Sequence, residues 1–241
     1  MATVGLQSTT DAADPIAGNV RQHASWSPYD NNGGTVVAVA GSDYCIIAGS
    51  TRLSTGFSVL SREHSSLHQL SRMCVLASSG FEGDRATLTK RLKSRAVMYQ
   101  HSHKRPIGCE AMAQALSNEL YGKRFFPFYT FNILAGLDAD GTGAVYSYDA
   151  VGSYERTGYA AQGTGNDLVQ PLLDNQLRAA SPLVLPKKPS VTALPVERAL
   201  DIVRDALTAA GERDIYTGDS IEVWIMTKDG IRKESTPLKT D

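Results

Sequence analysis

Hydroxyl side chains gather near the amino-terminal part of the sequence, where two apolar segments meet. Residues 35–40 and 44–48 are almost unbroken apolar runs, and the Gly-Ser-Asp tripeptide between them suits a tight hairpin turn. We expect both strands to be buried on both faces. The hairpin would bring Ser50, Thr51 and Arg52 beside Thr35, where the first strand begins. A hydroxyl becomes a nucleophile when a base lies next to it, so any covalent catalysis is expected here.

Histidines offer a second kind of chemistry, because two of them stand four positions apart. A metal pair of this spacing needs a helix and a third ligand. The segment around His64 and His68 has no helical pattern and no carboxylate beyond Glu63. We interpret these two, together with His101 and His103 after a later helix, as surface residues. The sequence predicts neither a metal site nor a cofactor.

A glycine-containing turn, Gly163-Thr164-Gly165, precedes a helical pattern. It lacks the Lys and the spacing of either nucleotide-binding motif, so it predicts only a helix that follows a turn.

Composition excludes several classes of function. The 241 residues carry a net charge of −1, which argues against a nucleic-acid or membrane-surface role, and 42% are hydrophobic, as in ordinary globular proteins. Cys45, Cys74 and Cys109 are an odd number in apolar surroundings and predict buried thiols in a reducing compartment. We find no secretory signal and no membrane span. The expected location is the cytoplasm, the nucleus or both.

The elements that must position these residues follow from periodicity. Residues 1–26 read as a flexible leader, and 27–241 as a single domain. Strand and helix patterns alternate as strands, two helices, strands, two helices, strands. This order predicts an α+β domain with two packed antiparallel sheets between helix layers. Four helices are expected. The first begins with Asp84 as its N-cap, and the others span residues 108–122, 166–177 and 195–211. The expected later strands include residues 57–60, 73–77, 128–135, 143–148, 221–227 and 231–235.

Several segments together resemble the proteasome beta subunits, which belong to the N-terminal-nucleophile hydrolase superfamily. They are residues 32–35, 122–127, 143–154, 170–176 and 227–232. The resemblance is sharpest for the non-catalytic beta-6 class of the eukaryotic core particle. It implies a four-layer αββα sandwich. In active members, a Thr freed from a preceding Gly uses its own amine as base. An Asp follows sixteen positions later and a Lys sixteen further on.

When this pattern is aligned with the present sequence, the positions of the catalytic Thr, Asp and Lys all hold other residues; we call these the degenerate positions. Thr51-Arg52 matches the motif that follows the Asp, so Ser50 stands where the Asp belongs. Counting sixteen back gives Gly34, and sixteen forward gives Ser66. The resemblance therefore predicts no catalytic residue. The alternative is an active threonine peptidase that uses Thr35, but shifting the pattern by one places Thr51, again not a carboxylate, at the Asp position. We favour Thr35 as a β-branched strand residue.

Other expectations come from the resemblance alone. Asp214 and Thr217 match residues that support the nucleophile in active members, and we interpret them as inherited scaffold that caps backbone groups. Asp149 matches a carboxylate that faces the substrate groove of the neighbouring chymotrypsin-like subunit. A turn Asp capping Val151 or Gly152 is an equally good interpretation.

The resemblance also implies partners. These are the other alpha and beta subunits of a four-ring particle, and regulatory particles through that complex. Exposed aromatic residues at 125, 126, 128 and 129 favour large protein interfaces. Leaders of the family are propeptides, and an inactive subunit keeps part of its leader. A third hypothesis, from a different class, is a stand-alone binding protein that borrowed the fold.

Overall fold

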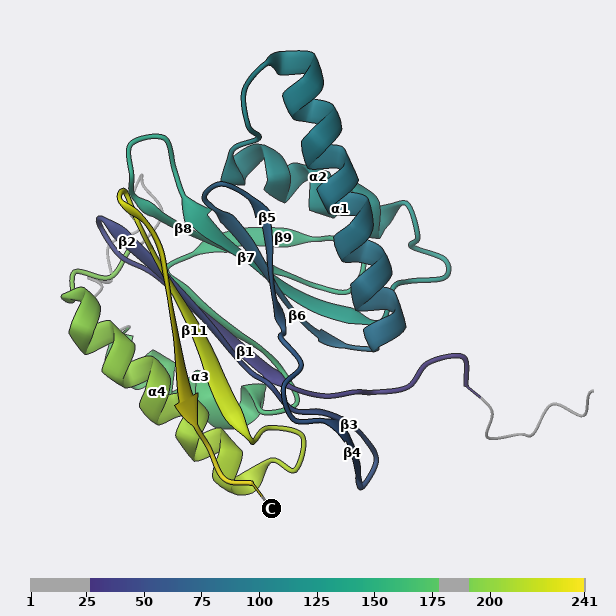
Figure 1. Cartoon of the computed structure of the whole chain (residues 1–241), viewed down its shortest axis with the longest axis vertical. Helices are drawn as coiled ribbons and strands as arrows, with labels where there is room; N and C mark the ends of the chain where they lie inside the picture. Colours follow the sequence, from purple (N-terminus) through teal and green to yellow (C-terminus); the bar gives the residue numbers. More distant parts are fainter. Residues whose placement is uncertain (1–26, 178–190, 241) are drawn as a thin grey trace, which may run out of the picture.

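Two five-stranded antiparallel sheets form the centre of the computed structural model, which describes residues 27–177 and 191–240 (Figure 1). The first sheet has the strand order β10-β1-β2-β11-β12, and the second β5-β6-β7-β8-β9. A separate two-stranded hairpin is formed by β3 and β4. The expected leader, residues 1–26, lies outside the described residues, as do residues 178–190.

The element bounds run in chain order. They are β1 Thr35–Ala40, β2 Tyr44–Ser50, β3 Leu53–Thr55, β4 Ser58–Ser61, β5 Leu67–Ser71, β6 Cys74–Gly80, α1 Glu82–His103, α2 Cys109–Tyr121, β7 Thr130–Leu137, β8 Gly143–Tyr148, β9 Tyr154–Thr157, β10 Tyr159–Gly163, α3 Asn166–Leu177, α4 Val196–Arg213, β11 Ser220–Thr227 and β12 Gly230–Pro237.

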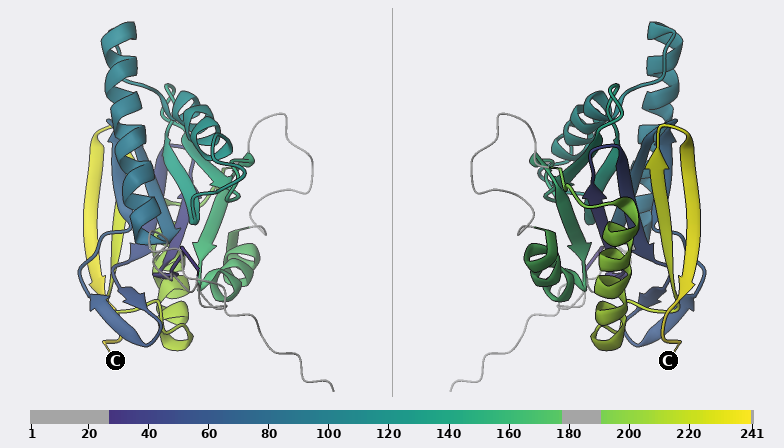
Figure 2. Two further views of the ribbon diagram at one scale, coloured as in Figure 1. Left: turned by 90° about the vertical axis from the view of Figure 1, so that its right-hand side faces the viewer. Right: turned by 90° about the vertical axis from the view of Figure 1, so that its left-hand side faces the viewer.

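Three apolar clusters hold four layers together. One lies between the two sheets, a second joins the first sheet to α3 and α4, and a third joins the second sheet to α1 and α2. Figure 1 shows the two helix pairs on opposite sides of the paired sheets. In the side views, the carboxyl-terminal end of α1 projects beyond the sheet edges (Figure 2). The predicted αββα sandwich is confirmed.

The β1–β2 hairpin is the centre of this arrangement. Alternate residues of a strand point to opposite faces. Val37 and Val39 accordingly join the cluster beneath α4, whereas Val36 and Ala38 join the cluster between the sheets. Every residue of both strands is buried, as predicted.

Two predicted helix limits were wrong. Helix α1 starts at Glu82 after Phe81, which makes no side-chain cap, and the Asp84 carboxylate instead accepts a hydrogen bond from the Tyr129 backbone N–H at 2.8 Å. Helix α4 continues past Gly211 to Arg213. A glycine within a helix costs only about 1 kcal/mol, which the buried apolar face of α4 outweighs.

Of the four aromatic residues expected to be exposed, Phe125 and Phe126 are exposed, Tyr129 is half-buried and Phe128 is buried. Phe125 is 94% exposed, as expected, but Phe128 is only 4% exposed and packs in the cluster beneath α1 and α2. Arg91 and Lys123 lie over its ring, with 5.6 and 5.3 Å to the centroid. Strand β7 starts at Thr130, two residues after the predicted position 128.

The expectation of surface histidines is confirmed for His101 and His103 but needs correction for His64 and His68, which are half-buried. His68 lies in β5 rather than in a loop, and His64 pairs with Glu82 across 3.1 Å. His101 and His103 form the exposed last turn of α1 instead of following it. Among the residues described, no group of three His, Cys, Asp or Glu side chains is placed to hold a metal ion. No helix in the described ranges is long and apolar enough to cross a membrane.

Candidate functional site

The three degenerate positions lie together where β1 begins. Gly34 precedes β1, Ser50 ends β2, and Ser66 precedes β5. A Cβ added to Gly34 would stand 3.6 Å from the Ser50 hydroxyl oxygen and 3.9 Å from that of Ser66. A spacing of sixteen residues along the chain thus becomes direct proximity, because the hairpin returns Ser50 to the start of β1 and the beginning of β5 brings in Ser66.

The hydroxyls at this point are engaged with backbone groups. Ser50 Oγ accepts a hydrogen bond from the Thr35 N–H at 3.2 Å, and the Ser66 hydroxyl donates to the Ser50 carbonyl oxygen at 3.1 Å. Both serines are buried. Neither side chain carries a charge, and the glycine between them has no side chain at all. The three positions therefore hold neither the Thr, the Asp nor the Lys of the active pattern.

Thr35 contributes its hydroxyl to a separate buried chain of hydrogen bonds. Its Oγ1 lies 2.6 Å from Thr217 Oγ1 and accepts from the Gly165 N–H at 3.0 Å. The Thr217 hydroxyl donates to the Asp214 carboxylate at 2.6 Å. Since a hydroxyl has one proton to give, Thr35 must be the donor to Thr217. The Thr35 side chain is fully buried, and its donor and acceptor capacity is used within the fold.

Asp214 organises the loop that follows α4. One carboxylate oxygen accepts from the hydroxyls of Thr164 and Thr217, both at 2.6 Å, and the other accepts from the Tyr216 N–H at 3.1 Å. The expected capping of backbone by Asp214 is confirmed. For Thr217 the expectation was wrong, because its hydroxyl contacts the Thr35 and Asp214 side chains rather than backbone.

The segment before Gly34 is anchored by Asn32. Its N–H donates to the Gly80 carbonyl at 3.1 Å, and its side-chain amide donates to the Ser54 carbonyl at 3.2 Å. Its side-chain oxygen accepts from the Glu82 N–H at 2.8 Å. Asn32 therefore ties the chain to the end of β6 and to β3. Gly34 lies inside a continuous backbone that is fixed on both sides.

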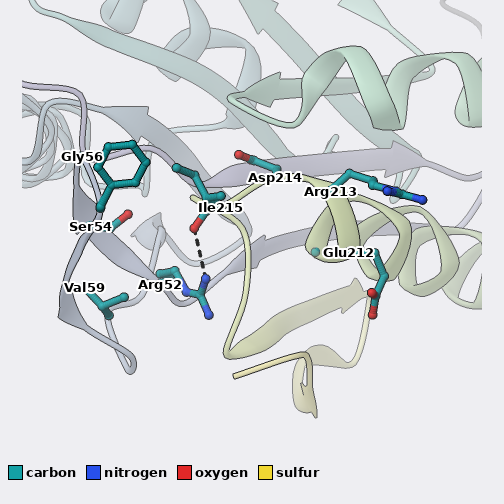
Figure 3. A pocket seen from close by; sticks show the side chains of 10 residues that line it. Arg52, Ser54, Gly56, Val59, Glu212, Arg213, Asp214 and Ile215 are labelled. Carbon is teal, nitrogen blue, oxygen red and sulfur yellow. Dashed lines mark hydrogen bonds between the residues drawn. The ribbon is translucent and has the colours of Figure 1, made fainter. Parts of the chain in front are cut away.

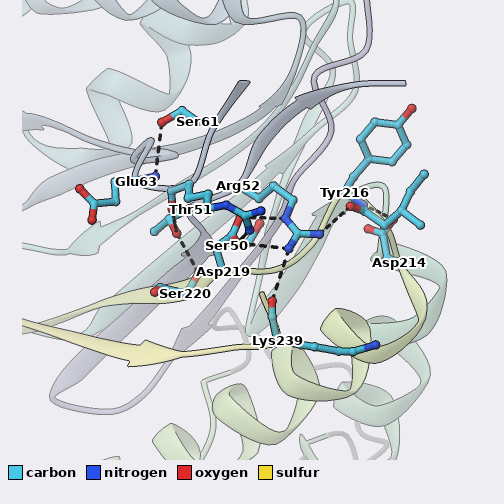
Figure 4. Close-up of polar contacts among 12 residues, drawn as sticks. Ser50, Thr51, Arg52, Ser61, Glu63, Asp214, Tyr216, Asp219, Ser220 and Lys239 are labelled. Atoms are coloured by element: carbon cyan, nitrogen blue, oxygen red, sulfur yellow. Dashed lines mark hydrogen bonds and ion pairs between the residues drawn. The ribbon is translucent and has the colours of Figure 1, made fainter. Parts of the chain in front are cut away.

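An ion pair fixes the loop between α4 and β11 beside this site (Figure 4). Arg52 donates Nε–H to one Asp219 carboxylate oxygen at 2.8 Å and Nη2–H to the other at 3.2 Å. Arg62 also contacts Asp219. Burial alone would raise the pKa of Asp219, but the hydrogen bonds from Arg52 and Arg62 hold it below its usual range. The pair therefore remains charged although both partners are buried.

A surface cavity of about 290 Å³ opens on the far side of the same loop (Figure 3). It lies between the β3–β4 hairpin and the end of α4, with Arg52 donating to the Ile215 carbonyl at 3.1 Å along one wall. Its rim includes Phe57, which is 99% exposed. Asp214 lines it as well, but that carboxylate already accepts the hydrogen bonds described above. The Glu212 carboxylate and the Ser54 hydroxyl also line the cavity.

Asp149 lies away from this cluster, directly after β8. It is exposed, and its Oδ1 accepts from the backbone N–H groups of Val151 at 3.0 Å and Ser153 at 2.8 Å. The turn-capping interpretation is thereby confirmed, with Ser153 in place of Gly152 as the second donor. A role in a neighbouring subunit's groove stays a prediction.

Sequence reasoning missed the residues that fix the site from a distance. Asn32 was treated only as part of a motif, and Asp219 was not singled out. Asp219 is 167 residues from Arg52. The one available signal was the Arg in an otherwise apolar and hydroxyl-rich stretch, because a guanidinium next to buried strands requires a carboxylate partner.

Two antiparallel sheets packed between helix layers, with a strand that starts at the site, define the N-terminal-nucleophile hydrolase fold. The family model described as "Proteasome subunit" matches residues 30–226, and the chain belongs to this family. It is 58% identical over 221 residues to "Proteasome subunit beta type-1" of Arabidopsis thaliana, covering 92% of this chain and 99% of that protein. The protein of the same name from Dictyostelium discoideum is 47% identical over 232 residues, which is 96% of this chain and 95% of that protein. "Proteasome subunit beta type-6" of Saccharomyces cerevisiae is 40% identical over the full length of both chains.

Proposed function

We propose that the chain is a non-catalytic beta subunit of the 20S proteasome core particle, where it contributes to protein degradation by building the beta ring. The observation that carries this proposal is Gly34. It occupies the position of the nucleophile, beside Ser50 and Ser66, and has no side chain. Similarity to beta type-1 proteins over nearly the whole chain supports the structural role.

The geometry also disfavours the alternative, a peptidase that uses Thr35. A terminal Thr nucleophile needs a free amine and an accessible hydroxyl. The nitrogen of Thr35 is a peptide N–H bonded to Ser50, and its hydroxyl is fully buried against Thr217. Asn32 further holds the preceding residues in place. For Thr35 to act as a nucleophile, the anchored backbone before it would have to be cleaved and its buried hydroxyl would have to become exposed.

Exposed apolar side chains support the proposal that the chain is part of a large multi-subunit complex. A subunit that contacts ring neighbours and other rings needs several apolar contact surfaces. We propose other alpha and beta subunits as direct partners, regulatory particles through the complex, and work in the cytoplasm and nucleus. The exposed large apolar residues include Phe57 and Leu60 on the β3–β4 hairpin, Val97 and Met98 on α1, Tyr121 at the end of α2, and Phe125 and Phe126 after it.

Amino-terminal mapping of this chain by mass spectrometry, taken from the purified particle, tests the proposal. We expect the mature chain to begin upstream of Gly33, and reagents that need both an amine and a hydroxyl to leave Thr35 unlabelled. A Thr35→Val variant, which keeps the β-branched shape, should assemble and leave the particle's peptidase activities unchanged. A mature start at Thr35, together with loss of one activity in the variant, would establish the peptidase instead. Recovery of the chain from cell extract mainly as a monomer, outside any large particle, would favour the stand-alone binding protein.

Asp149 is proposed to edge the substrate pocket of the neighbouring chymotrypsin-like subunit. Two variants separate this role from the turn. Asp149→Asn keeps an oxygen that can accept from Val151 and Ser153 but removes the charge, whereas Asp149→Ala removes both. If the charge faces the groove, both variants should change cleavage after large apolar residues without changing assembly. Unchanged cleavage in the Asn variant would leave Asp149 as a turn residue only.

A further inference from the structure

Two buried thiols meet between a helix and the sheet beneath it. Cys74 is the first residue of β6 and Cys109 the first of α2. Their Sγ atoms are 3.5 Å apart, with the Cys74 thiol placed to donate to Cys109, although 35 residues separate them in the chain. The third cysteine, Cys45, instead directs its thiol to the Ala144 carbonyl oxygen at 3.8 Å. Only the first two are therefore placed to react with each other among the residues described.

A glycine on the adjacent strand makes room for this contact. Gly136 of β7 is the register partner of Cys74. A Cβ on Gly136 would stand 2.8 Å from Cys109 Sγ and 2.2 Å from the Met73 carbonyl oxygen, both far inside normal contact. Any larger residue would push the α2 thiol away from the β6 thiol. The backbone at this point thus keeps the two sulfur atoms in contact.

The pair can be reached from the surface through one of its members. Cys109 lines a cavity of about 450 Å³ whose walls include Met73, Tyr99, Ile107 and Asp138. Cys109 is 3% exposed, whereas Cys74 lies behind it with no exposed surface. A small oxidant entering the cavity would therefore meet Cys109 first, and Cys74 would be positioned to act second.

We propose that Cys74 and Cys109 form an oxidation site, which hydrogen peroxide or a similarly small peroxide converts into an intrachain disulfide. In the first step, Cys109 Sγ attacks one peroxide oxygen and the O–O bond breaks. The displaced hydroxide takes the thiol proton and leaves as water, and Cys109 becomes a sulfenic acid. In the second step, Cys74 Sγ attacks the Cys109 sulfur, the S–S bond forms and the S–O bond breaks. The leaving hydroxide takes the Cys74 proton, so two thiols and one hydrogen peroxide yield one disulfide and two waters.

The movement required is small. A disulfide needs its sulfur atoms about 2.05 Å apart, so the 3.5 Å separation must close by about 1.5 Å. Cys109 stands at the first turn of α2, directly after a loop residue, Gly108, around which a Cβ would find open space. We expect Gly108, which has this open space, to shift with the Cys109 sulfur. The cross-link would tie the α1–α2 helix layer to the second sheet, and it does not depend on the proposed role in the proteasome.

The test uses the assembled particle that contains this chain. It is treated with hydrogen peroxide, its remaining thiols are blocked with N-ethylmaleimide, and it is digested without reductant for mass spectrometry. We expect a linked peptide pair containing Cys74 and Cys109 that disappears on treatment with dithiothreitol. The free thiols of this chain should fall from three to one. Cys45→Ala is the matched control and should keep the link, whereas Cys74→Ala and Cys109→Ala should lose it.

Three results would overturn the proposal. One is the absence of a linked peptide at peroxide concentrations that oxidise exposed methionines such as Met98. Another is conversion of Cys109 to sulfinic acid while Cys74 stays free. The third is a link that involves Cys45. If an alanine variant fails to assemble, the peptide map of the unmodified chain still decides, because it identifies the joined cysteines directly.

Discussion

Asp219 provides the sharpest test of how the site is held, because removing its charge leaves a buried cation without its carboxylate. The Arg52 and Asp219 side chains are each 4% exposed and are joined by two hydrogen bonds. Breaking a buried, hydrogen-bonded pair by removing one partner costs about 3–5 kcal/mol of unfolding free energy. We expect Asp219→Asn to lose about that much.

Asparagine is the right replacement because the backbone of Asp219 has φ of +66°. Asn tolerates this left-handed conformation far better than most residues, so the variant changes the charge without adding backbone strain. The matched control is Arg62→Gln. Arg62 also contacts Asp219, but its side chain is 49% exposed. Removing an ion pair of this kind costs about 0–1 kcal/mol.

Urea denaturation of the purified chain, followed by circular dichroism, measures both losses. The difference between the two variants should be at least about 2 kcal/mol near neutral pH. The native pKa of Asp219 lies below its unfolded value of about 3.9. Its stabilisation is therefore present above that value and lost as the pH falls through the native pKa. The gap between the unmodified chain and the Asp219→Asn variant should close in acid. Equal losses in the Asp219→Asn and Arg62→Gln variants, or a gap independent of pH, would refute this reasoning.

Two further perturbations have clear expected outcomes. Gly163→Ala should lower the unfolding free energy by at least about 2 kcal/mol, because φ at Gly163 is +104° and the new Cβ would stand 2.0 Å from the Gly34 carbonyl oxygen. Gly56→Ala is the control, because its Cβ would meet open space, and it should lower the unfolding free energy by about 1 kcal/mol. Thermal unfolding measures both losses. Comparable losses in the two variants would contradict the close Cβ contact as the cause. Burial and the nearby Arg85 charge lower the pKa of His68 to about 4. As the pH falls, His68 is therefore protonated in the unfolded chain before it is protonated in the folded chain. The unfolding free energy should consequently fall as the pH drops from about 6.5 towards 4. The His68→Gln variant should lose most of this dependence of stability on pH. If NMR shows that His68 in the folded chain titrates near pH 6.5, the explanation is wrong.

The position of the site could be predicted well from the sequence, whereas its supports could not. Gly34, Ser50 and Ser66 come from the spacing that the resemblance to proteasome beta subunits implies, and the structure brings them close together. The short turn of the β1–β2 hairpin returns Ser50 to the start of β1, whereas Ser66 reaches it only because β5 packs beside it. Asn32 and Asp219 depend on segments that meet only after both sheets have packed.

Periodicity and residue chemistry by themselves determined the layers. The unbroken apolar run of β1 indicates burial on both faces, and the stripe of Leu88 and Leu92 on α1 indicates burial on one face, since apolar surface leaves water wherever a regular element allows it. The burial of all three cysteines follows from the same reasoning. These are properties of a segment and its period, so they can be derived before the fold is known.

Tertiary structure alone decided which side chains became partners. The contact of Thr35 with Thr217 spans 182 residues, and the meeting of Cys74 with Cys109 depends on how α2 lies over β6 and β7. No local pattern encodes either pairing, because hydrogen-bond and thiol contacts form within about 3–4 Å. Whether two distant residues come that close is set by how the sheets and helices pack around one core.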